Sequence, residues 1–110
     1  MLSKYLKYFI LILSVQYTIA QKEATHWYFG EKAGLDFTSG SPVVVTNGAL
    51  RTDEGCATIS DATGKLLFYT DGSTVWNRNH HIMPTGTGLL GNSTSTQSAI
   101  IVPKLDDVNI

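Results

Sequence analysis

The stretch GKLLFYTDGSTVWNRNHHIM, residues 64–83, decides the fold of this chain. Two runs rich in β-branched and aromatic residues flank the dipeptide Asp71-Gly72, which is typical of a tight hairpin turn. We expect Asp71 and Gly72 to adopt positive φ, and residues 77–79 to make a second bend before a pair of histidines. The stretch therefore predicts consecutive antiparallel strands.

The first of these strands is apolar on both of its faces. Strand side chains alternate, so Leu66 and Phe68 should point to one face and Leu67 and Tyr69 to the other. A sheet with one solvated face would instead alternate between apolar and polar residues. Such strands need cover on both sides, which a β-sandwich or a β-propeller provides.

The rest of the chain has the same strand-and-turn character. Apolar residues never follow a helical period for long, and turn sequences separate short apolar runs. The sequence predicts an all-β fold of antiparallel meanders, with strands within residues 25–30, 34–38, 41–46, 55–61, 65–71, 73–77, 81–84 and 98–104.

A weak internal repeat favours the propeller over the sandwich. CATISDATGKLLF begins at Cys56, and SAIIVPKLDDVNI begins at Ser98, 42 positions later. One four-stranded propeller blade spans about 40 to 45 residues. Since the last predicted strand has no partner, we interpret residues 21–110 as the amino-terminal piece of a longer, WD-repeat-like propeller, holding about one to two blades.

The first twenty residues have the pattern of a signal peptide. Lys4 and Lys7 precede an apolar run at residues 8–15, and a small residue, Ala20, marks the expected cleavage point. The apolar run is much shorter than the roughly 20 residues that span a bilayer. We therefore expect an exported chain that begins at Gln21 and is not held in a membrane.

Composition limits the partners of the mature chain. Without Lys4 and Lys7 it carries six basic and nine acidic residues, a net charge of −3, which makes nucleic acid an improbable partner. The single cysteine, Cys56, has no partner for an internal disulfide. Because it lies in a predicted strand, we interpret it as a small buried apolar residue.

Three segments together carry a resemblance to a known family. They follow one another after a signal peptide: HWYFGEKAGLDF, residues 54–91 and STQSAIIVPK. This order resembles the start of large exported surface proteins of Bacteroidetes, which open with a propeller-like region. Their carboxyl-terminal type IX secretion sorting domain, of the gliding-motility-associated kind, is not present in this sequence. The resemblance implies adhesion at the cell surface and supplies no catalytic residue.

The paired histidines are candidate metal ligands. His80 and His81 are neighbours, so on a strand they would point to opposite faces and could not chelate one ion together. A metal site would need His26 or a distant carboxylate to join them. We expect a polar turn between strands and predict no metal and no cofactor.

The acidic pairs do not amount to a catalytic site. Asp53 with Glu54, and Asp106 with Asp107, could supply the two carboxylates of a glycoside hydrolase, which lie about 5 to 10 Å apart. Neighbouring acids in turns are more often solvated hairpin tips. The segment DGSTVW at residues 71–76 resembles the Asp-box turn of sialidase-like propellers, although Tyr69 and Val75 depart from that pattern. An Asp-box is a structural turn, so it would support a propeller rather than an enzyme.

The aromatic residues are the remaining candidates for binding. Trp27, Tyr28, Phe29 and Trp76 could stack on sugar rings if they are exposed. Trp27 and Phe29 share one strand face and Tyr28 takes the other, so we expect at least one of these sets to be buried. For Trp76, which ends a predicted strand, we expect packing between blades rather than a role in binding.

These features favour a secreted or cell-surface, non-enzymatic binding or adhesion module. Its partners would be extracellular polysaccharide or protein, together with the rest of its own propeller. The alternative is a propeller-type glycan hydrolase whose catalytic residues lie outside this chain.

Overall fold

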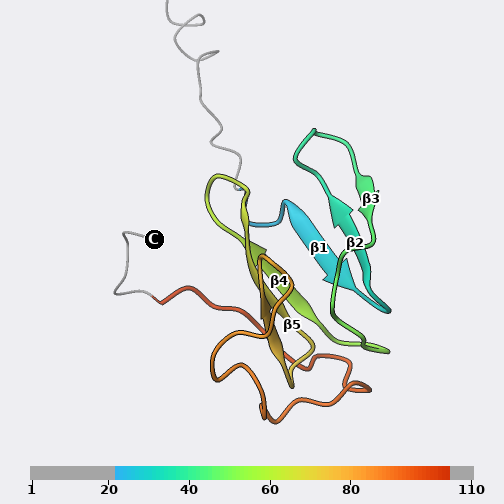
Figure 1. Cartoon of the computed structure of the whole chain (residues 1–110), viewed down its shortest axis with the longest axis vertical. Helices are drawn as coiled ribbons and strands as arrows, with labels where there is room; N and C mark the ends of the chain where they lie inside the picture. Colours follow the sequence, from blue (N-terminus) through green and yellow to red (C-terminus); the bar gives the residue numbers. More distant parts are fainter. Residues whose placement is uncertain (1–21, 105–110) are drawn as a thin grey trace, which may run out of the picture.

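The computed structural model describes residues 22–104, which form two antiparallel three-stranded sheets lying side by side (Figure 1). Six of the eight predicted strands are present, and no helix occurs among these residues. The all-β prediction is confirmed. The first sheet contains β1 (His26–Phe29), β2 (Ala33–Asp36) and β3 (Val43–Val45), and the second contains β4 (Ala57–Ser60), β5 (Leu66–Thr70) and β6 (Val75–Asn77).

The turn between β1 and β2 anchors the first sheet to the chain that leads to the second. This turn pairs Phe29 with Ala33, and both Gly30 and Lys32 have positive φ. Its tip bonds to the segment around Leu50: the Lys32 N–H donates to the Leu50 carbonyl at 2.8 Å, and the Thr52 N–H donates to the Gly30 carbonyl at 3.0 Å. The fully buried Leu50 is thereby fixed between the two sheets.

The second sheet departs from strict alternation. Ile59 pairs with Phe68, but Ser60 pairs with Leu66, so a β-bulge interrupts the register. A bulge places an extra residue on one strand and re-aims its side chains. Leu66 and Tyr69, predicted on opposite faces, are consequently both buried and belong to one core. The alternation predicted for this strand is wrong at the bulge.

The β5–β6 hairpin is made by a side chain as well as by glycine. Only Gly72 has positive φ, at 90°, so the expectation of positive φ at Asp71 is wrong. The Asp71 carboxylate instead accepts hydrogen bonds from the N–H groups of Ser73 and Thr74, both at 2.9 Å. An aspartate that bonds to the backbone just ahead of it forms a turn without leaving the common region of φ.

The two remaining predicted strands behave differently from each other. Residues 81–84 contribute a single bridge, between Trp76 and Ile82, which extends the second sheet by a short fourth segment. Residues 98–104 form no strand, so this prediction is wrong, and with it the strand that the 42-residue repeat required. The β4 edge of the second sheet faces β1, its β6 edge holds Ile82, and Pro103 lacks the N–H that strand pairing uses.

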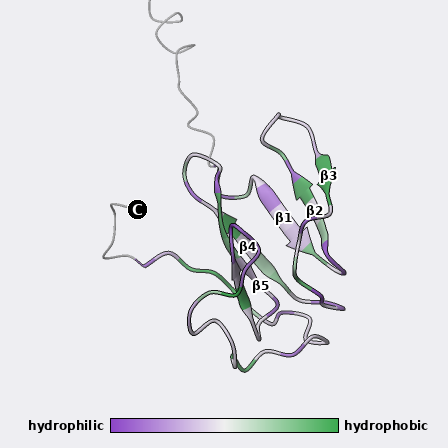
Figure 2. Cartoon of the chain, viewed as in Figure 1, coloured by the Kyte–Doolittle hydropathy of each residue, from purple (hydrophilic) through white to green (hydrophobic). Residues whose placement is uncertain are grey.

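Residues 101–104 instead pass beside a face of the second sheet. Ile101 to Lys104 line a cleft of about 410 Å³ together with Ile59, Leu67 and Phe68. This apolar carboxyl-terminal segment appears in green beside β4 and β5 (Figure 2). Contact with a sheet face thus replaces pairing with a sheet edge.

Side chains and one backbone N–H of residues 56–60 connect the second sheet to β1 and the segment before it. The Thr58 hydroxyl accepts from the Tyr28 N–H at 3.0 Å and lies 3.3 Å from the Tyr28 carbonyl, to which the Cys56 thiol also donates at 3.4 Å. The Ser60 N–H donates to the Glu23 carbonyl at 2.8 Å. The Cys56 and Thr58 side chains therefore satisfy the backbone of Tyr28 at the edge of β1, as buried backbone groups require, and Ser60 bonds to the segment before β1.

The core lies between the sheets and is small. Its buried apolar members are Tyr28, Leu50, Leu66 and Tyr69. The predicted signal peptide at residues 1–20, and Asp106 and Asp107, lie outside the described residues.

Candidate binding surface

One face of the first sheet is apolar and open. Trp27 pairs with Leu35, and Leu35 pairs with Val44, so these side chains lie on one face together with Phe29. Trp27 is 50% exposed, Phe29 is 40% exposed and Val44 is 75% exposed. Tyr28, on the opposite face, is buried. The prediction that one of the two aromatic sets is buried is confirmed, and the other set forms the surface that we call the aromatic face: Trp27, Phe29, Leu35 and Val44.

Trp27 is fixed although half of it is exposed. Its indole N–H donates to the Ala24 carbonyl at 2.9 Å, which satisfies its single polar group. Its ring packs on Phe37 with a centroid distance of 5.3 Å and an interplanar angle of 50°. A tilted ring pair of this kind is a favoured aromatic geometry. Little conformational freedom therefore remains to be lost when a ligand packs on this ring.

A shallow groove of about 210 Å³ runs beside Trp27. It is lined by Ala24, His26, Trp27, Tyr28, Phe29, Cys56 and Thr58. The Cys56 thiol and the Thr58 hydroxyl are already engaged with the backbone of Tyr28, so the wall contributed by β4 is held in place. The groove extends the aromatic face toward the second sheet.

Cys56 is free and only partly buried. Burial raises the pKa of its thiol. A raised pKa keeps the thiol protonated, and a protonated thiol is a poor nucleophile. Cys56 therefore contributes a hydrogen bond and packing; it lies just before β4 and is only partly buried, so the prediction of a buried strand residue is met only in part.

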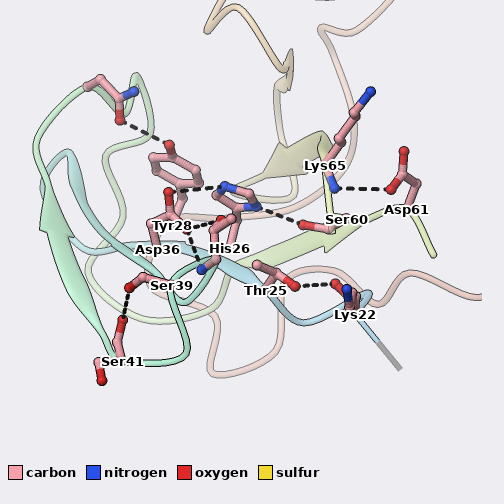
Figure 3. Close-up of polar contacts among 12 residues, drawn as sticks. Lys22, Thr25, His26, Tyr28, Asp36, Ser39, Ser41, Ser60, Asp61 and Lys65 are labelled. Carbon is pink, nitrogen blue, oxygen red and sulfur yellow. Dashed lines mark hydrogen bonds and ion pairs between the residues drawn. The ribbon is translucent and has the colours of Figure 1, made fainter. Parts of the chain in front are cut away.

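His26 belongs to a polar group on the inner side of β1 (Figure 3). Its Nδ1 lies 3.1 Å from the Ser60 hydroxyl, and its Nε2 lies 3.6 Å from the Asp36 carboxylate. The pKa of Asp36 is lowered, first by hydrogen bonds from the Thr38 hydroxyl and N–H and to a lesser degree by His26. These contacts connect β1, β2 and β4, so His26 has a structural role within the chain.

The paired histidines diverge, but in a turn rather than on a strand. His81 is exposed, whereas the His80 ring packs against Tyr28 and Tyr69, with centroid distances of 5.4 and 5.8 Å. Trp76 stacks on the other side of this cluster, 5.7 Å from Tyr69. Trp76 thus packs against the core from within its own sheet, whereas packing between blades stays a prediction. The contact of the partly buried His80 with the core is not predicted by the sequence, because adjacency alone does not say which histidine turns inward.

The other polar candidates are separate and solvated. Asp53 is exposed, and Glu54 accepts a hydrogen bond from Thr96 at 3.3 Å. The Asp-box-like segment is a hairpin turn, organised by Asp71 as described above. Within residues 22–104, no three histidine, cysteine or acidic side chains are grouped so that they could hold a metal ion.

One sequence signal for the loops was overlooked. Asp36, Asp61, Asp71, Asn77 and Asn92 all accept a hydrogen bond from the N–H two residues ahead. At three of these places the residue two ahead is threonine, whose hydroxyl bonds to the same oxygen. The pattern of aspartate or asparagine, any residue, then threonine could have located these turns from the sequence.

Searches against protein-family models, curated proteins and solved structures found no match for this chain. The described part of the chain contains no helix long and apolar enough to span a membrane. The candidate surface therefore rests on its own geometry.

Proposed function

We propose that this chain acts as a secreted or cell-surface binding module, without enzymatic activity, and that it contacts its ligand through the aromatic face. The observation that carries the proposal is Trp27, a large ring that is half exposed and yet fixed by Ala24 and Phe37. Large apolar side chains gathered on one exposed face are typical of interaction sites. Extracellular polysaccharide is the ligand class we propose, because the apolar faces of sugar rings pack on aromatic rings.

The second sheet supports the proposal that the module is part of a β-propeller. β4, β5 and β6 form a meander, and the bridge at Ile82 adds the beginning of a fourth strand. Four antiparallel strands in sequence make one propeller blade. We further propose export through the amino-terminal segment, and the surface-protein family described above as the setting in which such a module would act.

Depletion by insoluble polysaccharides tests the binding proposal. The chain is mixed with cellulose, chitin or xylan, and the unbound fraction is measured. We expect retention on at least one of them, and about tenfold weaker retention of Trp27→Ala, which corresponds to about 1.4 kcal/mol. Trp27→Phe, which keeps a ring, should lose less.

Leu90→Ala is the matched control, because Leu90 is fully exposed outside the aromatic face. It should bind as the unmodified chain does, and circular dichroism should show that all variants are folded. Absence of retention on every polysaccharide would contradict the polysaccharide ligand. Release of reducing sugar ends by the chain would contradict a non-enzymatic module.

A further inference from the structure

Two turns of the second sheet have the same construction, although their sequences differ. In residues 61–65 and 77–81 the first residue accepts hydrogen bonds from the N–H groups of the third and fifth. The N–H of the first residue donates to the carbonyl of the fifth, at 2.8 Å in both turns. The fourth residue has positive φ in both: 91° at Gly64 and 64° at His80.

The fourth position of this turn favours glycine, so His80 occupies it at a cost. Side chains are strained at positive φ because Cβ approaches the backbone. The His80 side chain makes contacts that glycine would lack: its ring packs on Tyr28 and Tyr69, and its Nδ1 lies 2.8 Å from the Tyr69 hydroxyl. A strained residue whose side chain enters the core is held there by those contacts.

The direction of the bond between Tyr69 and His80 follows from a third group. The Ala49 N–H donates to the Tyr69 hydroxyl oxygen at 2.9 Å, so that oxygen already accepts one hydrogen bond. Tyr69 is fully buried, and its own O–H must find an acceptor. Within the described residues that acceptor is Nδ1 of His80. His80 is therefore neutral, with its proton on Nε2.

We propose that His80 is a proton-sensitive latch: protonation of Nδ1 removes the acceptor of the buried Tyr69 hydroxyl and releases the 77–81 turn from the Tyr28–Tyr69 core. The proton comes from the solvent, because the His80 side chain is only partly buried. After protonation both ring nitrogens are donors, so the Tyr69 O–H no longer has a hydrogen-bond acceptor. Such a buried orphan donor favours opening of the turn.

The surroundings of His80 support a loss of stability in mild acid. The titratable groups that face it are the phenols of Tyr28 on β1 and Tyr69 on β5, and the neighbouring His81. Burial, and to a lesser degree His81, lowers the pKa of His80 below its ordinary value of 6.5. The unfolded chain then binds this proton more readily than the folded chain, so stability falls as the pH drops through 6.5 toward the folded-state pKa.

Unfolding measured between pH 8 and pH 5 tests the latch. We expect the unfolding equilibrium constant to rise below pH 6.5 by up to about tenfold per pH unit, the limit for one linked proton. His80→Asn, which tolerates positive φ and does not titrate, should flatten this rise. The matched control His81→Asn should keep most of it, because burial, the main cause of the lowered pKa of His80, is unchanged.

A second measurement does not depend on any variant. Nitrogen chemical shifts of the His80 ring, recorded on the unmodified chain at pH 8, should show Nδ1 without a proton and Nε2 with one. A proton on Nδ1 would overturn the proposal. It would also be overturned if His80→Asn kept the full acid dependence, or if His81→Asn abolished it.

Discussion

The two sheets have the same number of strands and the same antiparallel order, but their strands differ in solvent exposure. β5 is buried at Leu66, Tyr69 and Thr70. β3 consists of three valines, of which none is buried, and Figure 2 shows this strand as strongly hydrophobic. The more apolar strand is thus the more exposed one. Burial follows from what packs against a strand, and apolar content alone does not determine it.

The largest loss of stability should come from a substitution at the centre of the core, in the buried strand β5. Tyr69 is fully buried, stacks on Tyr28 and Trp76, and bonds to Ala49 and His80. Tyr69→Ala should lower the free energy of unfolding by about 3 to 5 kcal/mol, as for other large aromatic residues in cores. Denaturant unfolding measures this loss.

Tyr69→Phe separates packing from hydrogen bonding in that experiment. It keeps the ring and leaves the Ala49 N–H without its acceptor, so about 1 to 3 kcal/mol should be lost. If Tyr69→Ala cost no more than Tyr69→Phe, the stacking of the three rings would not be the main contribution.

A smaller effect is expected where the two sheets meet. Thr58→Val preserves the shape of the side chain but removes the hydroxyl that accepts from the Tyr28 N–H. We expect a loss of about 1 to 3 kcal/mol, because that buried donor is left unpaired. Chemical denaturation at neutral pH measures it.

Thr46→Val is the control for this prediction, since Thr46 is exposed just after β3. It should change stability by no more than about 0.5 kcal/mol. Equal effects of the two substitutions would show that side chains of β4 do not hold the sheets together.

The smallest effect on stability should occur on the aromatic face. Val44 is 75% exposed, so Val44→Lys should change the free energy of unfolding by no more than about 0.5 kcal/mol. It should nevertheless increase solubility, because a lysine on an edge strand opposes pairing between chains. Light scattering at increasing protein concentration tests this. A large loss of stability would mean that Val44 is covered, and would remove the contrast between the two sheets.

Local chemistry determined the strands and most of the turns. β-branched and aromatic residues mark five of the six strands, because these residues suit an extended backbone, whereas β2 (AGLD) contains none. Glycine and the short polar side chains located the turns between them, because their effect reaches only a few residues along the chain. Strand alternation also required that Trp27 and Phe29 lie on one face and Tyr28 on the other, and only Tyr28 is buried.

Tertiary structure decided the rest. Residues 98–104 are as apolar as a strand, but pairing needs a free edge, and the edges of the second sheet face β1 and Ile82. Because of the bulge near Ser60, the side chains of Leu66 and Tyr69 are both buried in the same core. His80 lies against Tyr69 because the 77–81 turn meets the core there. Each of these outcomes depends on contacts between residues distant in sequence, and a local pattern carries no information about which edge or face is already occupied.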